Sequence, residues 1–327
     1  MLAIIFVCLM ILIALFVLLK GADYLVDGSA DLARFLRVSP IVVGLTIMAF
    51  GTSLPEFIIS FFSALNGQSD IAIGNIVGSN IANLALIVGI GAIVAKNIKV
   101  RSTSLMYEMP FLVVSSFLLL ILADDFFIFG KDTLTLSRFD GMVLLLVFVI
   151  FMSYIFSSIK EQRKTVTKEF SIEFKNKNPL WKNILFVVGG LAALIAGGRI
   201  FTLYAGQLAD LAGLSGSFIG LTIAALGTSL PELAATITAL WKKQGDIALG
   251  NIVGSNIFNI LFVLGITSMI RPITIDSIIL SVDAIVMIFI SLVFLVFATK
   301  DTNINWTEGT SLLMMYVIYI IFVFWRM

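Results

Sequence analysis

The amino-acid sequence predicts an all-α polytopic membrane protein with ten transmembrane helices arranged as two inverted five-helix repeats. The 327 residues are 60% hydrophobic and 13% charged, and the mean hydropathy is +1.10, whereas about a quarter of the residues in soluble domains are charged. Apolar stretches of about 20 residues, enough to cross a bilayer, recur along the chain. Residues 44–91 match residues 220–267 at 26 of 48 positions without a gap, which is a large internal repeat.

Hydropathy and turn residues place the ten spans. The N-terminal run is interpreted as the first span and not as a signal peptide, because its positive residue, Lys20, follows the apolar run instead of preceding it. The expected spans are residues 2–20, 40–65, 70–95, 105–123, 139–158, 183–205, 217–241, 246–269, 278–298 and 309–326.

The most charged segment, residues 160–182, separates the two copies of the repeat. We expect residues 1–159 and 183–327 to form one five-helix half each, with 160–182 as the linker. Because five is odd, the second half enters the membrane from the opposite side, so the repeats are inverted. Inverted repeats that meet near the membrane midplane are common in secondary transporters.

The distribution of positive charge predicts the orientation. With both termini outside, 16 of the 21 Lys and Arg residues fall in loops on the inner side, including Lys20, Arg34 and Arg37, and 5 fall on the outer side. The positive-inside rule therefore predicts external termini and a cytoplasmic linker.

Each repeat carries the motif GTSLPE inside a span, at residues 51–56 and 227–232. Pro55 lacks an amide hydrogen and its ring clashes with the Gly51 carbonyl, so the helix must break or bend there. The carbonyls from Ala49 to Thr52 are expected to lose their intrahelical partners, which is costly in hydrocarbon unless another group satisfies them. A dehydrated cation would do so, and the same holds for the second motif.

The motif also brings oxygen-bearing side chains into the span. Thr52 and Ser53 add hydroxyls and Glu56 adds a carboxylate; Thr228, Ser229 and Glu232 are their counterparts. Proline kinks and Ser or Thr residues are ordinary in membrane helices. A glutamate inside a span costs at least a few kcal/mol, so two at matched positions indicate a functional site.

A second motif, GNxxGSNxxN, occupies residues 74–83 and 250–259. Its Ser and final Asn are four residues apart and share one helix face, which we expect to point toward the glutamates; these residues are Ser79 and Asn83 in the first copy and Ser255 and Asn259 in the second. For Asn75, Asn80, Asn251 and Asn256, ion binding and helix packing are both open. Asp70 and Asp246 are expected to be helix N-caps, and Asp283 to lie at the membrane interface.

The combined donor set consists of oxygen atoms. Oxygen ligands suit Ca²⁺ and Na⁺, and the chain has no histidine and only one cysteine, in the first apolar run, which argues against zinc or copper. No cofactor is expected. Two carboxylates balance one Ca²⁺ or two Na⁺, so competition of the two cations for one site would itself give exchange.

The pair GTSLPE and GNxxGSN, present in both halves, resembles the alpha repeats of the cation/calcium exchanger superfamily, and within it the prokaryotic-type sodium/calcium exchangers. The resemblance implies ion coordination by Glu56 and Glu232, and sliding of spans 1 and 6 during transport. It further implies ligands at Ala49, Thr52, Ser53, Ser79 and Asn83, and at Ala225, Thr228, Ser229, Ser255 and Asn259. Some prokaryotic relatives carry Asp where this chain has Asn259, and the neutral amide favours Na⁺ over H⁺ as counter-ion.

The function expected from these features is Na⁺/Ca²⁺ antiport by alternating access, extruding Ca²⁺ across the cell membrane, by a protein that acts as a monomer in the lipid bilayer. H⁺/Ca²⁺ exchange or K⁺-dependent exchange on the same fold is the alternative. The repeats form one gated site and not a pore lined by rings of charge, and enzymatic dyads or anchored metals are not evident. A net charge of +1 gives no indication of nucleic-acid binding, and no nucleotide-binding motif is present.

Overall fold

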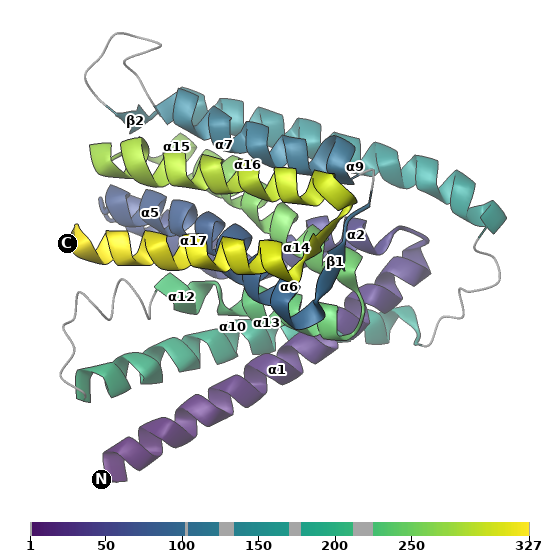
Figure 1. Ribbon diagram of the computed structural model, residues 1–327, viewed down its shortest axis with the longest axis horizontal. Coiled ribbons are helices and arrows are strands. Elements are labelled where there is room, and N and C mark those ends of the chain that lie inside the picture. Colours follow the sequence, from purple (N-terminus) through teal and green to yellow (C-terminus); the bar gives the residue numbers. More distant parts are fainter. Residues whose placement is uncertain (1, 102–103, 124–133, 170–177, 212–224, 327) are drawn as a thin grey trace.

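The computed structural model describes residues 2–101, 104–123, 134–169, 178–211 and 225–326. They form a bundle of long helices with short strands near two opposite ends (Figure 1). Within the described residues, eight helices are long and apolar enough to span a membrane, and a pair bent by 45°, residues 40–52 and 54–65, adds a ninth. The expected seventh span, 217–241, falls partly on residues 212–224, which lie outside the described residues.

The described elements of the first half begin with one long helix and a broken one. They are α1 (Leu2–Leu36), α2 (Pro40–Val43), η1 (Gly44–Met48), α3 (Ala49–Thr52), α4 (Leu54–Leu65), α5 (Ser69–Ile81), η2 (Ala82–Ile87), α6 (Val88–Ala95), β1 (Asn97–Lys99), η3 (Ser104–Glu108), α7 (Met109–Ala123), β2 (Thr135–Leu136) and α9 (Arg138–Glu169).

The second half repeats this order where it is described. Its elements are α10 (Leu180–Leu211), α12 (Ala225–Thr228), α13 (Leu230–Trp241), α14 (Gly245–Ile257), η5 (Phe258–Leu264), α15 (Gly265–Ile270), β3 (Ile273–Thr274), η6 (Ile279–Asp283), α16 (Ala284–Asp301), β4 (Asn303–Asn305) and α17 (Trp306–Trp325).

The first helix is much longer than the expected span 2–20. It continues to Leu36, so Lys20 and Arg34 lie in the helix and not in a loop. Ion pairs one turn apart, Lys20 with Asp23 and Asp31 with Arg34, satisfy the charges of this extension. The helix stops where Arg37 adopts a positive φ of 55°. Similarly, α9 runs to Glu169, into the segment expected to be linker.

The two small sheets each join one half of the chain to the other. β1 pairs with β4, matching Ile98 to Ile304, and β2 pairs with β3, matching Leu136 to Ile273. β1 and β3 follow equivalent motif helices, whereas β2 and β4 precede the last span of their halves. The repeat relationship therefore relates the β1–β4 sheet to the β2–β3 sheet. The two sheets lie toward opposite ends of the bundle (Figure 1), as expected for inverted repeats.

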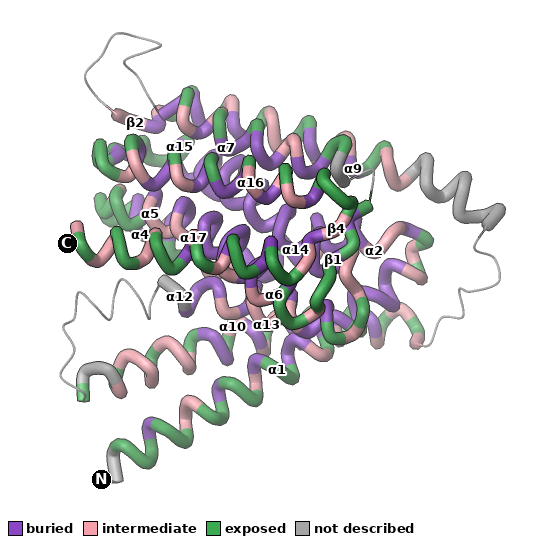
Figure 2. Tube along the Cα trace, in the orientation of Figure 1, coloured by how far each residue is buried: buried purple, intermediate pink, exposed green. Residues whose placement is uncertain are grey.

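The motif helices form the centre of the protein. α14 with its continuation to Ile270 is the most buried of the candidate spans, whereas the first span has mostly exposed residues toward its N-terminus (Figure 2). The motif segments of the two halves pack without side chains between them: a Cβ added to Gly44 would lie 2.7 Å from the Ile247 carbonyl oxygen. This contact brings the two polar motifs within hydrogen-bonding distance of each other.

Candidate functional site

The two motif glutamates are buried at equivalent helix starts. Glu56 lies in the first turn of α4 and Glu232 in the first turn of α13, and both are almost wholly inaccessible, at 1% and 0% exposure. In each case the chain breaks at the preceding serine, and the motif proline occupies the first turn, where its missing amide hydrogen costs no helical bond. The positive end of the helix dipole then faces the carboxylate.

At the helix break before Pro55, the hydrogen bonding of the Ala49 carbonyl differs from what the sequence predicts. The Ser53 amide donates to the Ala49 carbonyl at 3.1 Å, so the Ala49 carbonyl keeps a helical partner and the expectation that it loses one was wrong. The reason is that the helix continues regularly to Thr52 and turns at Ser53, whose φ and ψ are −82° and 4°. A carbonyl oxygen has a second lone pair, so Ala49 retains the capacity to bind a cation.

Each glutamate contacts hydroxyl groups of the opposite repeat. Ser53 Oγ donates to Glu232 Oε1 at 3.3 Å, and Thr52 also interacts with the Glu232 carboxylate. Reciprocally, the hydroxyls of Thr228 and Ser229 interact with the carboxylate of Glu56. The polar groups of the two repeats therefore form one shared cluster.

The serines and threonines connect this cluster to the following helices. Ser79 Oγ donates to Glu56 Oε1 at 3.3 Å and lies 3.4 Å from Ser229 Oγ. Thr52 Oγ1 donates to Asn251 Oδ1 at 3.1 Å and lies 3.4 Å from Ser255 Oγ. The structure thus brings together eight of the residues named from the sequence: Thr52, Ser53, Glu56, Ser79, Thr228, Ser229, Glu232 and Ser255.

The remaining four residues named from the sequence have different surroundings. Ala49 lies one turn before Ser53 and is buried. Asn259 donates its amide to Asn80 at 3.0 Å, and Asn83, also buried, makes no side-chain hydrogen bond. Ala225 begins α12, and its side chain lies outside the described residues.

Four of the residues named from the sequence have a buried side-chain oxygen without a hydrogen-bond partner. These oxygens are Glu56 Oε2, Glu232 Oε2, Asn83 Oδ1 and Asn259 Oδ1. Buried acceptors without partners are rare in proteins, and together with the neighbouring hydroxyls these oxygens suit a hard cation such as Ca²⁺ or Na⁺. Within the described residues there is no group of three or more His, Cys, Asp or Glu side chains that could hold a metal ion, so the cation chemistry here depends on two carboxylates and neutral oxygens.

Two asparagines that the sequence left open between packing and ion binding support the motif helices. Asn75 Nδ2 donates to the Glu56 carbonyl at 3.2 Å and to Ser60 Oγ at 2.9 Å. Asn251, its counterpart, donates to Thr236 Oγ1 at 3.3 Å. A signal for this role was present in the sequence, because Ser60 and Thr236 are also equivalent positions of the repeat.

The two aspartates expected to be helix N-caps lie two positions further along their helices. Asp70 and Asp246 are not N-caps: Gln68 and Gln244 occupy those positions, and the aspartates lie in the first turn, favourably placed for the helix dipole. Asp246 also forms an ion pair with Arg101 at 2.5 Å.

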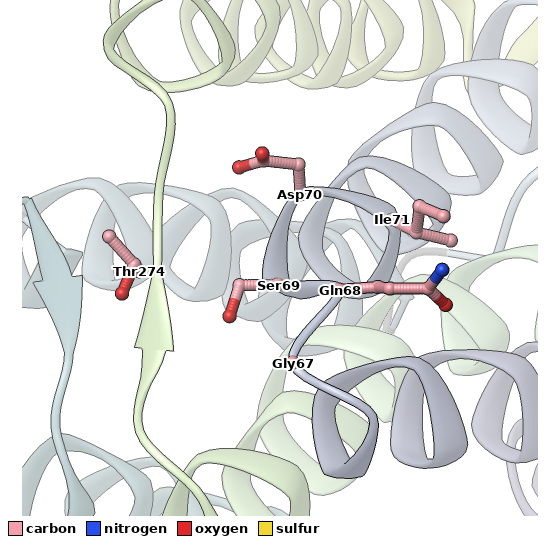
Figure 3. A pocket seen from close by; sticks show the side chains of 6 residues that line it. All are labelled: Gly67, Gln68, Ser69, Asp70, Ile71 and Thr274. Atoms are coloured by element: carbon pink, nitrogen blue, oxygen red, sulfur yellow. The ribbon is translucent and has the colours of Figure 1, made fainter.

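Asp70 lines a surface pocket of about 400 Å³, separate from the glutamates, together with Gly67, Gln68, Ser69, Ile71 and Thr274. Its carboxylate and the Ser69 hydroxyl point to the side where Thr274 lies, whereas Gln68 points away (Figure 3).

Asp283, expected at the membrane interface, is buried within the protein at the start of its span. Its carboxylate accepts two hydrogen bonds from Arg326, at 2.9 and 2.8 Å, and one from the Tyr319 hydroxyl at 3.1 Å. This ion pair joins the start of one span to the end of the next. No local pattern predicts this ion pair, because the partners are 43 positions apart.

Comparison with known proteins identifies the family. The profile described as sodium/calcium exchanger protein matches residues 6–157 and 182–325. The sodium/calcium exchanger MaX1 of Methanosarcina acetivorans is 33% identical over 97% of this chain and 98% of its own length. The inner membrane protein YrbG of Escherichia coli is 34% identical over 87% of this chain and 86% of its own. A more distant relative, the Ca²⁺/H⁺ antiporter ChaA of Bacillus subtilis, is 24% identical over 89% of this chain and 85% of its own.

A solved structure has the same fold. The sodium-calcium exchanger NCX_Mj, soaked with Na⁺ and without Ca²⁺, superposes with a TM-score of 0.80 at 31% identity, covering 97% of this chain and 98% of that one. Family profile, full-length relatives and fold agree with the internal repeat and the shared polar cluster. The chain is an integral multi-pass membrane protein and belongs to the sodium/calcium exchanger protein family.

Proposed function

We propose that the protein is a secondary antiporter that exchanges Na⁺ for Ca²⁺ at the cluster around Glu56 and Glu232. The observation that carries this proposal is the pair of buried carboxylates, each contacting hydroxyls of the opposite repeat and each with one oxygen lacking a hydrogen-bond partner. Buried charges require compensation, and a cation would provide it. Because the site combines both repeats, a cation bound there would contact both halves of the protein.

The proposed ligands are the two carboxylates with the neighbouring hydroxyl, amide and backbone oxygens. The carboxylates would contact both cations, since they carry the charge that either load must balance. The complete set is Glu56, Glu232, Thr52, Ser53, Ser79, Asn83, Thr228, Ser229, Ser255 and Asn259, with the main-chain oxygens of Ala49 and Ala225.

Charge balance explains why exchange would be obligatory. One Ca²⁺ or two Na⁺ neutralise two carboxylates, whereas the doubly negative site is costly to move through a region of low dielectric. The protein would therefore change its access side only when loaded. If more than two Na⁺ move for each Ca²⁺, transport carries net charge and responds to membrane potential.

The remaining assignments follow from the same proposal. We place the protein in the cell membrane as a functional monomer, with both termini outside, a five-helix half at residues 1–159, a cytoplasmic linker at 160–182 and the second half at 183–327. The excess of Lys and Arg in the segments that flank the inner ends of the expected spans supports this orientation. Where the Na⁺ gradient is directed inward, Na⁺ entering the cell would drive Ca²⁺ out.

Proton-coupled exchange is the second candidate, because the glutamates themselves could carry protons and because a relative bears the name Ca²⁺/H⁺ antiporter. The amides at both Asn83 and Asn259 favour Na⁺ instead, since an amide does not bind a proton at neutral pH. K⁺-dependent exchange on the same fold is a further variant.

The test is uptake of ⁴⁵Ca²⁺ into proteoliposomes loaded with Na⁺ and diluted into Na⁺-free medium. Choline-loaded vesicles and vesicles subjected to a pH jump are the controls. We expect uptake that requires internal Na⁺. Uptake that ignores Na⁺ and follows the pH gradient would replace the proposal with proton-coupled exchange.

A further inference from the structure

We infer that Asn80 is a positioning residue that determines which atom of the Asn259 amide faces the transported cations. This inference rests on the proposed function, because it concerns an oxygen of the proposed ion site. Asn80, Asn256 and Asn259 are all fully buried, so water does not compete for their hydrogen bonds. The orientation of each amide is therefore set by its protein partners.

The chain of hydrogen bonds begins at a backbone carbonyl. Asn80 Nδ2 donates to the carbonyl oxygen of Asn256 at 3.3 Å. A carbonyl oxygen only accepts hydrogen bonds, so the NH₂ group of Asn80 must point toward it. The amide oxygen of Asn80 is consequently directed to its other side, where it accepts from Asn259 Nδ2 at 3.0 Å.

The same reasoning fixes the next amide. An amide oxygen cannot donate, so Asn259 must present its NH₂ group to Asn80 and its Oδ1 in another direction. That oxygen is buried and has no hydrogen-bond partner. Asn259 follows Ser255 by four residues, and Ser255 lies against Thr52 of the cluster. Asn80 thus presents to the site an oxygen, which attracts a cation, and not an NH₂ group, which repels it.

The symmetry-related pair, Asn256 and Asn83, lacks this arrangement. Asn256 occupies the position equivalent to Asn80, yet its Nδ2 donates to the Ile252 carbonyl of its own helix at 2.7 Å. Neither amide atom of Asn83, the counterpart of Asn259, has a hydrogen-bond partner. The two repeats are therefore unequal at this point: the Asn259 oxygen is oriented before a cation binds, whereas the Asn83 amide is not.

The inference is tested by cation binding to the purified full-length protein, measured as ⁴⁵Ca²⁺ binding and its displacement by Na⁺, in four variants. Asn80→Ala removes the orienting acceptor, and we expect it to weaken binding about tenfold, equivalent to about 1.4 kcal/mol. Asn80→Asp in its protonated form keeps both bonds, donating to Asn256 and accepting from Asn259, and we expect binding within about twofold of the parent.

The decisive comparison uses Asn259→Asp, whose two oxygens make orientation irrelevant. In that background we expect Asn80→Ala to cause no loss of ⁴⁵Ca²⁺ binding. The carboxylate at position 259 presents an oxygen to the site in either orientation, and the Asn80 oxygen would face a carboxylate oxygen instead of an NH₂ group. An equal tenfold loss in both backgrounds would show a merely structural role and overturn the inference, as would parent-like binding by Asn80→Ala. Absence of Na⁺-displaceable ⁴⁵Ca²⁺ binding in the parent protein would instead refute the proposed function. Unfolding temperatures of all four variants identify any that do not fold.

Discussion

Gly250 lies where the motif helices of the two repeats pack backbone against backbone, and replacing it with alanine is expected to damage both folding and transport. A Cβ at this position would lie 2.5 Å from the Ile41 carbonyl oxygen, 2.9 Å from the Leu45 amide nitrogen and 3.0 Å from Gly44 Cα. All three atoms belong to the backbone, so no side-chain rotation relieves the contact. Restoring even 3.0 Å to the Ile41 oxygen requires a displacement of 0.5 Å, the difference from 2.5 Å.

The free-energy cost follows from two opposing effects. Overpacking of a core costs about 1–3 kcal/mol, and contacts with backbone atoms place this site near the upper end. Alanine is favoured over glycine in a helix by about 1 kcal/mol, which leaves a net loss of about 2 kcal/mol. The displacement also moves the segment that leads to Thr52, whose hydroxyl bonds Asn251, the residue after Gly250.

The assay is unfolding in detergent followed by tryptophan fluorescence, with ⁴⁵Ca²⁺ uptake measured on the same preparation. Gly189→Ala is the matched control, because it is exposed and no described atom lies within 4 Å of its added Cβ. We expect the control to be unchanged or slightly stabilised. A Gly250→Ala protein as stable and as active as Gly189→Ala would refute the reasoning.

Three other variants probe different parts of the structure. Asp283→Asn weakens the charged hydrogen bonds to Arg326 and should lower the free energy of unfolding by about 2 kcal/mol. Asp301→Asn, at an exposed position of the same span, is the control, and equal stability of the two variants would contradict the assignment. Lys242 contacts Asp23 and Asp27 of α1 at 3.2 and 2.9 Å, so Lys242→Ala should speed amide hydrogen exchange near these aspartates at low ionic strength. These ion pairs are partly exposed and worth no more than about 1 kcal/mol, so the difference in exchange rate between variant and parent should vanish at about 1 M salt. Lys243→Ala should exchange at the parent rate at either ionic strength. Thr52→Val keeps the side-chain shape but removes the hydroxyl near Asn251, Ser255 and Glu232, and should weaken Na⁺ and Ca²⁺ binding about tenfold, whereas Thr46→Val, whose hydroxyl bonds its own helix, should not.

The features that depend on local sequence could be predicted. The repeat, the proline break and the two buried glutamates follow from spacing, helix geometry and the cost of charge in a membrane. Fold class and family were confirmed, and both predicted motifs lie at the centre of the bundle. The roles of the individual ligands remain predictions.

The features that depend on tertiary contacts could not be predicted. The extension of α1 beyond Lys20 is supported partly by Lys242, more than 200 positions away in the sequence, and hydropathy alone ends the span at the first charge. The π-helical turns η2 and η5, which contain Asn83 and Asn259, have no signature in residue composition, although such turns are frequent at functional sites.

The central claim is that Glu56 and Glu232 bind the transported cations. The most direct measurement is Na⁺-dependent ⁴⁵Ca²⁺ uptake by Glu56→Gln and Glu232→Gln in proteoliposomes. Glu108→Gln is the control, a buried glutamate that accepts a hydrogen bond from Tyr154 at 3.0 Å and is not part of the cluster. We expect both site variants to fold but lose uptake, while the control retains it. Full uptake by either Glu56→Gln or Glu232→Gln would contradict the account.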